Sequence, residues 1–157
     1  MVTGLILAGG KSERYGSDKA LLGGVEKIAN AMRDCGFSRV IVLCGKPERM
    51  SLFNEECWPD LESCKGVLDV LKWAIEEIDD EIQLAPCDAL YLDAETIAEI
   101  RGVPVDDQGI RQPLLARLPR KFRPAGRSVN EMMSSIDSQI ISKPDKVRNV
   151  NFPSDLE

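Results

Sequence analysis

A glycine-rich segment near the start of the chain holds the residues best suited to chemistry. Gly9 and Gly10 follow a short apolar run and carry no Cβ atom, so their backbone can reach positive φ and bring N–H groups close to an anion. Ser12 adds a hydroxyl donor, while Arg14 and Lys19 add a guanidinium fork and a point charge for phosphate oxygens. These residue types at this spacing predict a site for a nucleoside triphosphate.

The apolar run before these glycines predicts where the site lies in the fold. Residues 4–7 are typical of a short strand that is covered on both faces. Such a strand delivers Leu7 and Ala8 to the carboxyl edge of a sheet, where open α/β sheets bind their ligands. The loop matches neither the P-loop, Gly-x-x-x-x-Gly-Lys-Ser/Thr, nor the dinucleotide motif, Gly-x-Gly-x-x-Gly.

Two further groups of polar residues are candidates for the same site. Asp88 follows the apolar run 81–85, so parallel strands would place it at the same sheet edge, where its carboxylate could hold Mg²⁺ against a triphosphate. The structural alternative is an aspartate that caps a helix or forms a turn. Asn149 and Asn151 alternate on a predicted short strand and would project to one face. Their structural alternative is turn formation.

Apolar periodicity predicts alternating strands and helices along the chain. Helices are expected over 25–35, 65–78, 94–101 and 129–136, and strands over 4–7, 39–44, 81–85, 111–118 and 147–150. Gly36 stands where the first helix should end, and residues 47–60 are less regular. This order predicts a three-layer α/β/α domain with a mostly parallel sheet.

The composition limits the class of protein. A chain of 157 residues with 43% hydrophobic composition suffices for one buried core, so a single domain over residues 1–157 is expected. The net charge of −6 disfavours a general nucleic-acid binder. No apolar run approaches the length of a membrane span and no leader is visible, so we expect a soluble, cytoplasmic protein. The five cysteines include no Cys-x-x-Cys pair and are expected to be buried free thiols.

One stretch of the chain is strongly basic. No acidic residue occurs between Ile110 and Asn130, whereas six basic ones do: Arg111, Arg117, Arg120, Lys121, Arg123 and Arg127. The stretch could be a solvated face. The alternative is a landing surface for a second anionic substrate or for an acidic partner protein that delivers or receives a cofactor.

The chain resembles a known family through several motifs in the same order. Residues 7–19 read Leu-Ala-Gly-Gly-x-Ser-x-Arg-x-Gly-x-Asp-Lys without a gap, and they are followed by Pro-Cys-Asp at 86–88, Gln-Pro-Leu-Leu-Ala at 112–116, Gly-Arg-Ser at 126–128 and Asn-Val-Asn-Phe-Pro-Ser-Asp-Leu at 149–156. The first motif is similar to the loop of the molybdenum cofactor guanylyltransferases, which are Rossmann-like nucleotidyltransferases. The resemblance covers nearly the whole chain.

The resemblance implies roles for these residues and a reaction. It implies that Asp88 binds Mg²⁺, that Asp60 and residues 7–10 contact GTP, and that Asn149 and Asn151 lie beside molybdopterin. The terminal phosphate of molybdopterin would attack the α-phosphorus of GTP and release pyrophosphate, with Arg14 and Lys19 stabilising the charge on the triphosphate. A phosphate nucleophile is already ionised at neutral pH, which suits a chain without histidine.

Some features leave other readings open. The chain goes from Leu22 almost directly into the first helix, and residues 43–45 and 65–69 match the family only in part, so base recognition stays open. A related enzyme, such as a cytidylyl or cobinamide phosphate guanylyltransferase, is one alternative. The Gly9 and Asp18-Lys19 residues favour guanylyl transfer over cytidylyl transfer, whose enzymes more often read Leu-Ala-Ala-Gly. A non-catalytic nucleotide-binding protein is the second alternative.

Overall fold

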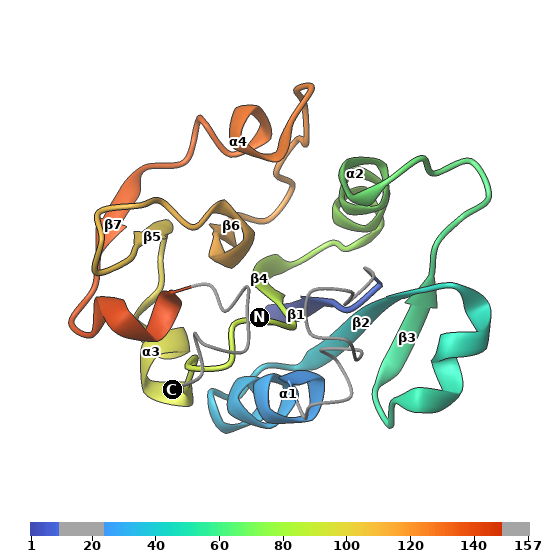
Figure 1. Cartoon of the computed structure of the whole chain (residues 1–157). Coiled ribbons are helices and arrows are strands. Elements are labelled where there is room, and N and C mark those ends of the chain that lie inside the picture. Colours follow the sequence, from blue (N-terminus) through green and yellow to red (C-terminus); the bar gives the residue numbers. More distant parts are fainter. Residues whose placement is uncertain (10–23, 149–157) are drawn as a thin grey trace.

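The computed structural model describes residues 1–9 and 24–148 (Figure 1). The chain starts with strand β1 (Val2–Leu7), helix α1 (Gly24–Asp34) and strand β2 (Arg39–Gly45), and β2 pairs with β1 in parallel. This unit agrees with the prediction. Helix α1 ends at the predicted place, because Gly36 adopts φ +79°, a conformation that costs glycine little.

Side chains alternate between the two faces of the sheet and build two cores. Ile6 and Val42 pack with α1 on one face, whereas Leu5 and Leu43 pack on the other face with helix α2 (Val67–Glu77). Figure 1 shows α1 and helix α3 (Ala94–Glu99) on one side of the sheet, and α2 and helix α4 (Val129–Met132) on the other. The three-layer α/β/α architecture is therefore confirmed.

The strand order places β1 at the centre of the main sheet. The order is β3-β2-β1-β4-β6, where β3 is Glu56–Pro59, β4 is Glu81–Pro86 and β6 is Arg117–Leu118. Strands β1 to β4 run in parallel, and only β6 is antiparallel. The chain runs outward from β1 through β2 to β3 and then returns through α2 to β4 on the other side of β1, so the strand order reverses between β1 and β4. This is the arrangement in which α/β sheets form a crevice at the carboxyl ends of the strands.

The predicted strand over 111–118 is wrong for most of its length. Pro113–Leu115 is a short 3₁₀ helix, and only Arg117–Leu118 joins the sheet. Pro113 has no N–H to donate to a ladder and its fixed φ suits the first turn of a helix. The predicted strand over 147–150 is also wrong where the structure describes it, because Val147 ends a 3₁₀ helix that begins at Pro144.

Three short strands were not predicted. Besides β3, these are β5 (Val103–Val105) and β7 (Ser138–Ile140), which pair in parallel as a separate two-stranded sheet. Each has four residues or fewer, and β3 and β5 contain proline, which lacks a ladder donor. All five cysteines are free thiols, but only Cys44 is buried, so the prediction of burial is wrong for the other four. No helix in the described part of the chain has the length and apolar character needed to cross a bilayer.

Candidate functional site

The carboxyl ends of four parallel strands line up along one edge of the sheet. Three backbone hydrogen bonds order this edge: Cys87 N–H donates to the Leu7 carbonyl at 2.9 Å, Ala8 N–H to Leu43 at 2.9 Å, and Asp60 N–H to Gly45 at 2.8 Å. Along this edge in space, from β3 to β4, the order of the residues at the strand ends is therefore Asp60, Gly45, Gly9 and Asp88. The described candidates for nucleotide and metal binding all lie on this single edge.

Gly9 is at the centre of the edge, two residues after the end of β1, and it is exposed. A Cβ atom on Gly9 would lie 2.7 Å from the Cα and 2.8 Å from the N of Gly45, so the two backbones approach as closely as glycine allows. Positive φ occurs at Gly45 (φ +85°) and not at Gly9. The predicted positive φ is therefore wrong at Gly9, whereas the approach of its N–H group to an anion stays a prediction. Close approach to Gly45, not backbone conformation, requires glycine at this position.

Asp88 occupies a turn directly after β4. The N–H of Ala89 donates to the Pro86 carbonyl at 3.2 Å, which puts Asp88 at the corner of this turn. The N-cap of α3 is Asp93, whose carboxylate accepts from the Thr96 N–H at 2.9 Å. Asp88 is thus not the cap of that helix. It is half-buried, and its Oδ1 atom is shielded from solvent.

Helix α1 begins against the same turn. A Cβ atom on Gly24, its first residue, would lie 2.3 Å from the carbonyl oxygen of Cys87. The absence of a side chain at Gly24 therefore lets the amino end of α1 meet the turn that carries Asp88. The positive dipole end of an 11-residue helix favours negative charge at this place.

Asp60 lies on the opposite flank of β1 from Asp88. It directly follows β3 and is exposed, and reduced solvation from the protein around it raises the pKa of its carboxyl above the ordinary value. Three strand spacings separate it from Asp88, which corresponds to about 14 Å. The two carboxylates therefore serve different parts of any ligand. Among the described residues, no three side chains of metal-binding type gather at one point.

Arg49 belongs to this edge, although the sequence analysis did not single it out. It lies in the 3₁₀ helix Pro47–Leu52, between β2 and β3. Its Nε donates to the Cys44 carbonyl at 2.8 Å and its Nη2 to the Ala8 carbonyl at 2.7 Å. An arginine in an irregular segment offers no sequence signal for such contacts, because they depend on how the segment folds back over the strands.

Several predicted site residues lie outside the described part of the chain. These are Gly10, Ser12, Arg14, Lys19, Asn149 and Asn151. Of the predicted nucleotide-binding residues, the structure describes Leu7, Ala8, Gly9, Asp60 and Asp88. Leu7 ends β1, Ala8 and Gly9 follow it, and the two aspartates follow β3 and β4.

The basic stretch does not form one continuous surface. Arg117 is buried, where its Nε donates to Gln83 Oε1 at 2.9 Å and desolvation lowers its pKa. Arg111 donates from its two Nη atoms to the carbonyls of Met133 and Ile136, at the end of α4. Two of the six basic residues are therefore used inside the fold and are not available to an anionic substrate or acidic partner.

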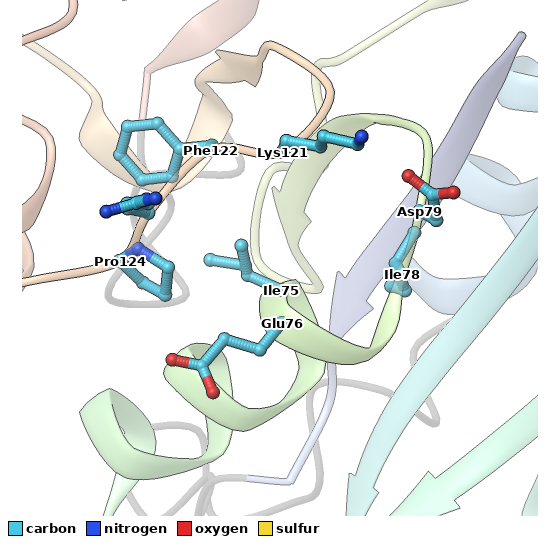
Figure 2. A pocket seen from close by; sticks show the side chains of 8 residues that line it. Ile75, Glu76, Ile78, Asp79, Lys121, Phe122 and Pro124 are labelled. Atoms are coloured by element: carbon cyan, nitrogen blue, oxygen red, sulfur yellow. The ribbon is translucent and has the colours of Figure 1, made fainter.

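Other residues of the stretch lie beside a surface pocket with a volume of about 510 Å³. Figure 2 shows Lys121 and Phe122 on one side of it and Glu76 and Asp79 on the other. Arg120 pairs with Asp79 at 2.8 Å. The pocket lies at the end of α2 that leads into the amino end of β4, so it is remote from the carboxyl edge. Its mixed charges do not favour a highly anionic ligand.

Comparison with known proteins shows which protein family the chain matches. The profile of the MobA-like NTP transferase domain matches residues 4–134. The molybdenum cofactor guanylyltransferase of Xanthomonas euvesicatoria is 30% identical over 134 residues, which cover 78% of this chain and 68% of that protein.

Solved structures agree with the fold. A nucleotidyl transferase from Methanothermobacter thermautotrophicus superimposes with a TM-score of 0.67, at 18% identity over 99% of this chain and 94% of the other. The 4-diphosphocytidyl-2C-methyl-D-erythritol synthase of Anaerococcus prevotii gives a TM-score of 0.59, at 7% identity over 99% and 94%. At such identities the likeness concerns the fold alone.

Proposed function

This chain belongs to the family of MobA-like NTP transferase domains, and we propose that it transfers GMP from GTP to the terminal phosphate of molybdopterin. The relative from Xanthomonas euvesicatoria, which is named for guanylyl transfer to the molybdenum cofactor, supports this choice of substrates. In the proposed reaction, a phosphate oxygen of molybdopterin forms a bond to the α-phosphorus of GTP. The bond between the α-phosphorus and its bridging oxygen breaks, and pyrophosphate leaves.

One observation carries the proposal: a close pair of glycines stands between two carboxylates on one sheet edge. Gly9 exposes its backbone at the end of the central strand, with Asp60 on one flank and Asp88 on the other. A nucleotide laid along this edge would place its base toward one carboxylate and its phosphates toward the other. The amino end of α1 adjoins Asp88, which favours the phosphates on that side.

Asp60 suits a guanine base better than a cytosine base. A carboxylate only accepts hydrogen bonds, and guanine offers an N–H and an adjacent amino group as donors. The Watson–Crick edge of cytosine carries a single amino donor beside acceptors that a carboxylate would repel. The exposure of Asp60 leaves its oxygens accessible from solvent. We therefore assign base selection to this residue.

Asp88 is the described residue that fits Mg²⁺. This ion is usually held by one or two carboxylates together with substrate phosphates, so one shielded carboxylate at the phosphate side of the edge is a suitable donor set. When bound, Mg²⁺ would neutralise charge on the triphosphate. Arg14 and Lys19 are proposed to donate to phosphate oxygens, and Asn149 and Asn151 to bind the acceptor, so that the chain supplies positioning and charge rather than a base.

Calorimetric titration with GTP, CTP, UTP and ATP in the presence of Mg²⁺ tests the nucleotide part of this proposal. Selective GTP binding is expected, and formation of the dinucleotide and pyrophosphate from molybdopterin then tests the acceptor. Preference for CTP would favour a cytidylyltransferase. GTP binding without transfer to molybdopterin would leave two alternatives, transfer to another acceptor such as cobinamide phosphate and a non-catalytic nucleotide-binding protein. Incubation with cobinamide phosphate and GTP distinguishes them.

A further inference from the structure

We propose that Arg49 is a positioning residue that fixes the place of Gly9 relative to Gly45 for nucleotide binding. This inference rests on the proposed function, since it concerns the strand end at Gly9 that would receive the triphosphate. Arg49 binds the carbonyls of Ala8 and Cys44, which directly precede Gly9 and Gly45. One guanidinium group thus holds both strands at the place where the two glycines meet.

The backbone ladder between β1 and β2 explains why a side chain must hold the two strand ends together at this place. Its last described backbone hydrogen bond runs from the Ala8 N–H to the Leu43 carbonyl. Beyond this bond, Gly9 and Gly45 press against each other without a side chain to fix their spacing. The carbonyls of Ala8 and Cys44 belong to buried residues at the end of this ladder, and a charged donor stabilises such acceptors.

Arginine suits this position for a geometric reason. Its planar group presents several N–H donors at fixed angles, so Nε and Nη2 can bind two carbonyls on different strands at once. The guanidinium also lies 5.9 Å from the centroid of the Phe53 ring, which restricts its orientation. A lysine would keep the charge but lose the rigid spacing between its two contacts. Positioning through Arg49 therefore predicts that charge alone does not suffice.

Arg111 provides a matched control. It is also half-buried and also binds two backbone carbonyls from one guanidinium, at 3.1 Å to Met133 and at 3.2 Å to Ile136, but it does so at the end of α4 rather than at the site edge. The variants Arg49→Lys and Arg111→Lys make the same chemical change in two places. A purely structural role for both arginines would lower stability in both variants without a selective effect on ligand binding.

The experiment measures the dissociation constant of GTP with Mg²⁺ and the thermal unfolding of the wild type and both variants. We expect similar losses of thermal stability, about a tenfold weaker binding of GTP in Arg49→Lys, as from loss of one or two hydrogen bonds, and unchanged binding in Arg111→Lys. Equal GTP affinities of the wild type and Arg49→Lys would overturn the inference, and so would equal losses of GTP affinity in both variants. If the wild type binds no nucleoside triphosphate, the proposed function fails together with it.

A second substitution covers the case in which Arg49→Lys does not fold. Arg49→Gln keeps a polar side chain with two N–H donors but is shorter and neutral, so it can reach at most one carbonyl. A folded Arg49→Gln protein is expected to bind GTP more weakly than the wild type by more than tenfold. Wild-type affinity in this variant would equally contradict a positioning role.

Discussion

Gly9 and Gly45 meet backbone to backbone at the carboxyl ends of β1 and β2. The contact is mutual, because a Cβ atom on Gly45 would lie 2.8 Å from the Cα of Gly9, just as one on Gly9 would lie 2.7 Å from the Cα of Gly45. No flexible side chain is present to yield, so either substitution must displace a strand end. The site therefore depends on two glycines that are 36 positions apart in the chain.

Gly9→Ala is expected to lower both stability and nucleotide affinity. Forcing a methyl group against the backbone of Gly45 should cost about 1–3 kcal/mol in the free energy of unfolding, as overpacking does elsewhere. Because the displaced backbone is the one proposed to bind phosphates, the affinity for GTP should fall at least roughly tenfold, a difference of about 1.4 kcal/mol. Urea denaturation and calorimetry measure the two effects.

Gly102→Ala is the control for Gly9→Ala. A Cβ atom on Gly102 would lie 2.5 Å from the Asp137 carbonyl oxygen, so the clash is also with backbone. Gly102 stands next to β5, in the separate two-stranded sheet. This variant should lose stability and keep its affinity for GTP. If both variants lost affinity alike, the Gly9 contact would have no specific role in the site.

Asp60→Asn is expected to raise stability at neutral pH while it weakens GTP selection. Reduced solvation raises the pKa of the Asp60 carboxyl, so the folded protein binds this proton more tightly than the unfolded chain does. The free energy of unfolding then decreases as pH rises between the ordinary and the raised pKa, and the whole decrease is present at pH 7. The neutral amide in Asp60→Asn does not ionise, so this decrease in the free energy of unfolding is absent from the variant.

Urea denaturation at pH 7 and at about pH 4, near the ordinary aspartate pKa, measures this effect. The variant should be at least as stable as the wild type at pH 7, and the difference should shrink toward the lower pH. The ratio of GTP to CTP affinity should fall, because the amide presents one acceptor in place of two. A less stable variant with an unchanged ratio would refute both assignments to Asp60.

Sequence periodicity predicted the inner part of the fold and failed at its margins. Residues of β1, β2 and β4 are apolar runs because both faces of these strands are buried, and the 3.6-residue repeat of α1 follows from one buried face. The edge elements have no such signal. Strand β3 is partly exposed along its length, and β6 consists of two residues whose pairing with β4 depends on distant contacts.

The candidate site was predictable where a residue directly follows a buried strand. Asp88 follows β4, and parallel pairing with β1 was enough to place it beside the glycine segment. The roles of Arg49 and Gly45 were not predictable in the same way. Both depend on contacts with the end of β1, more than 35 residues away in the chain, and on a 3₁₀ helix that folds back over two strand ends. No local pattern encodes such an approach.

Asp88→Asn is expected to remove the contribution of Mg²⁺ to GTP binding. The wild type should bind GTP more tightly with Mg²⁺ than with a chelator. The ratio of these two affinities should be at least about tenfold smaller in the variant, since even outer-shell metal partners contribute this much. Asp93→Asn is the control, because asparagine also caps helices and should keep α3 intact. A Mg²⁺ effect that survives in Asp88→Asn would assign the metal to other residues.

Cys57 is expected to react slowly with thiol reagents. Desolvation, reinforced by the neighbouring Cys44, raises the pKa of the Cys57 thiol to about 11. At pH 8 about one molecule in a thousand then carries the thiolate, against roughly a quarter for an ordinary cysteine. Alkylation by iodoacetamide, followed by peptide mass spectrometry, should be at least roughly a hundredfold slower in the native protein than in urea. Equal rates would mean that the thiol is not desolvated.

Lys19→Ala tests the charge that the chain itself is proposed to supply. Removing one preorganised donor to a reacting group costs on the order of 3 kcal/mol of transition-state stabilisation, so the rate of pyrophosphate release should fall roughly a hundredfold. Lys72→Ala is the control, since the Lys72 ammonium instead donates to the Gly126 carbonyl at 2.6 Å, on the side of α2. That variant should keep the wild-type rate. Near-normal turnover in Lys19→Ala would contradict the role proposed for Lys19, and the charge would then be stabilised by Mg²⁺ and the amino end of α1.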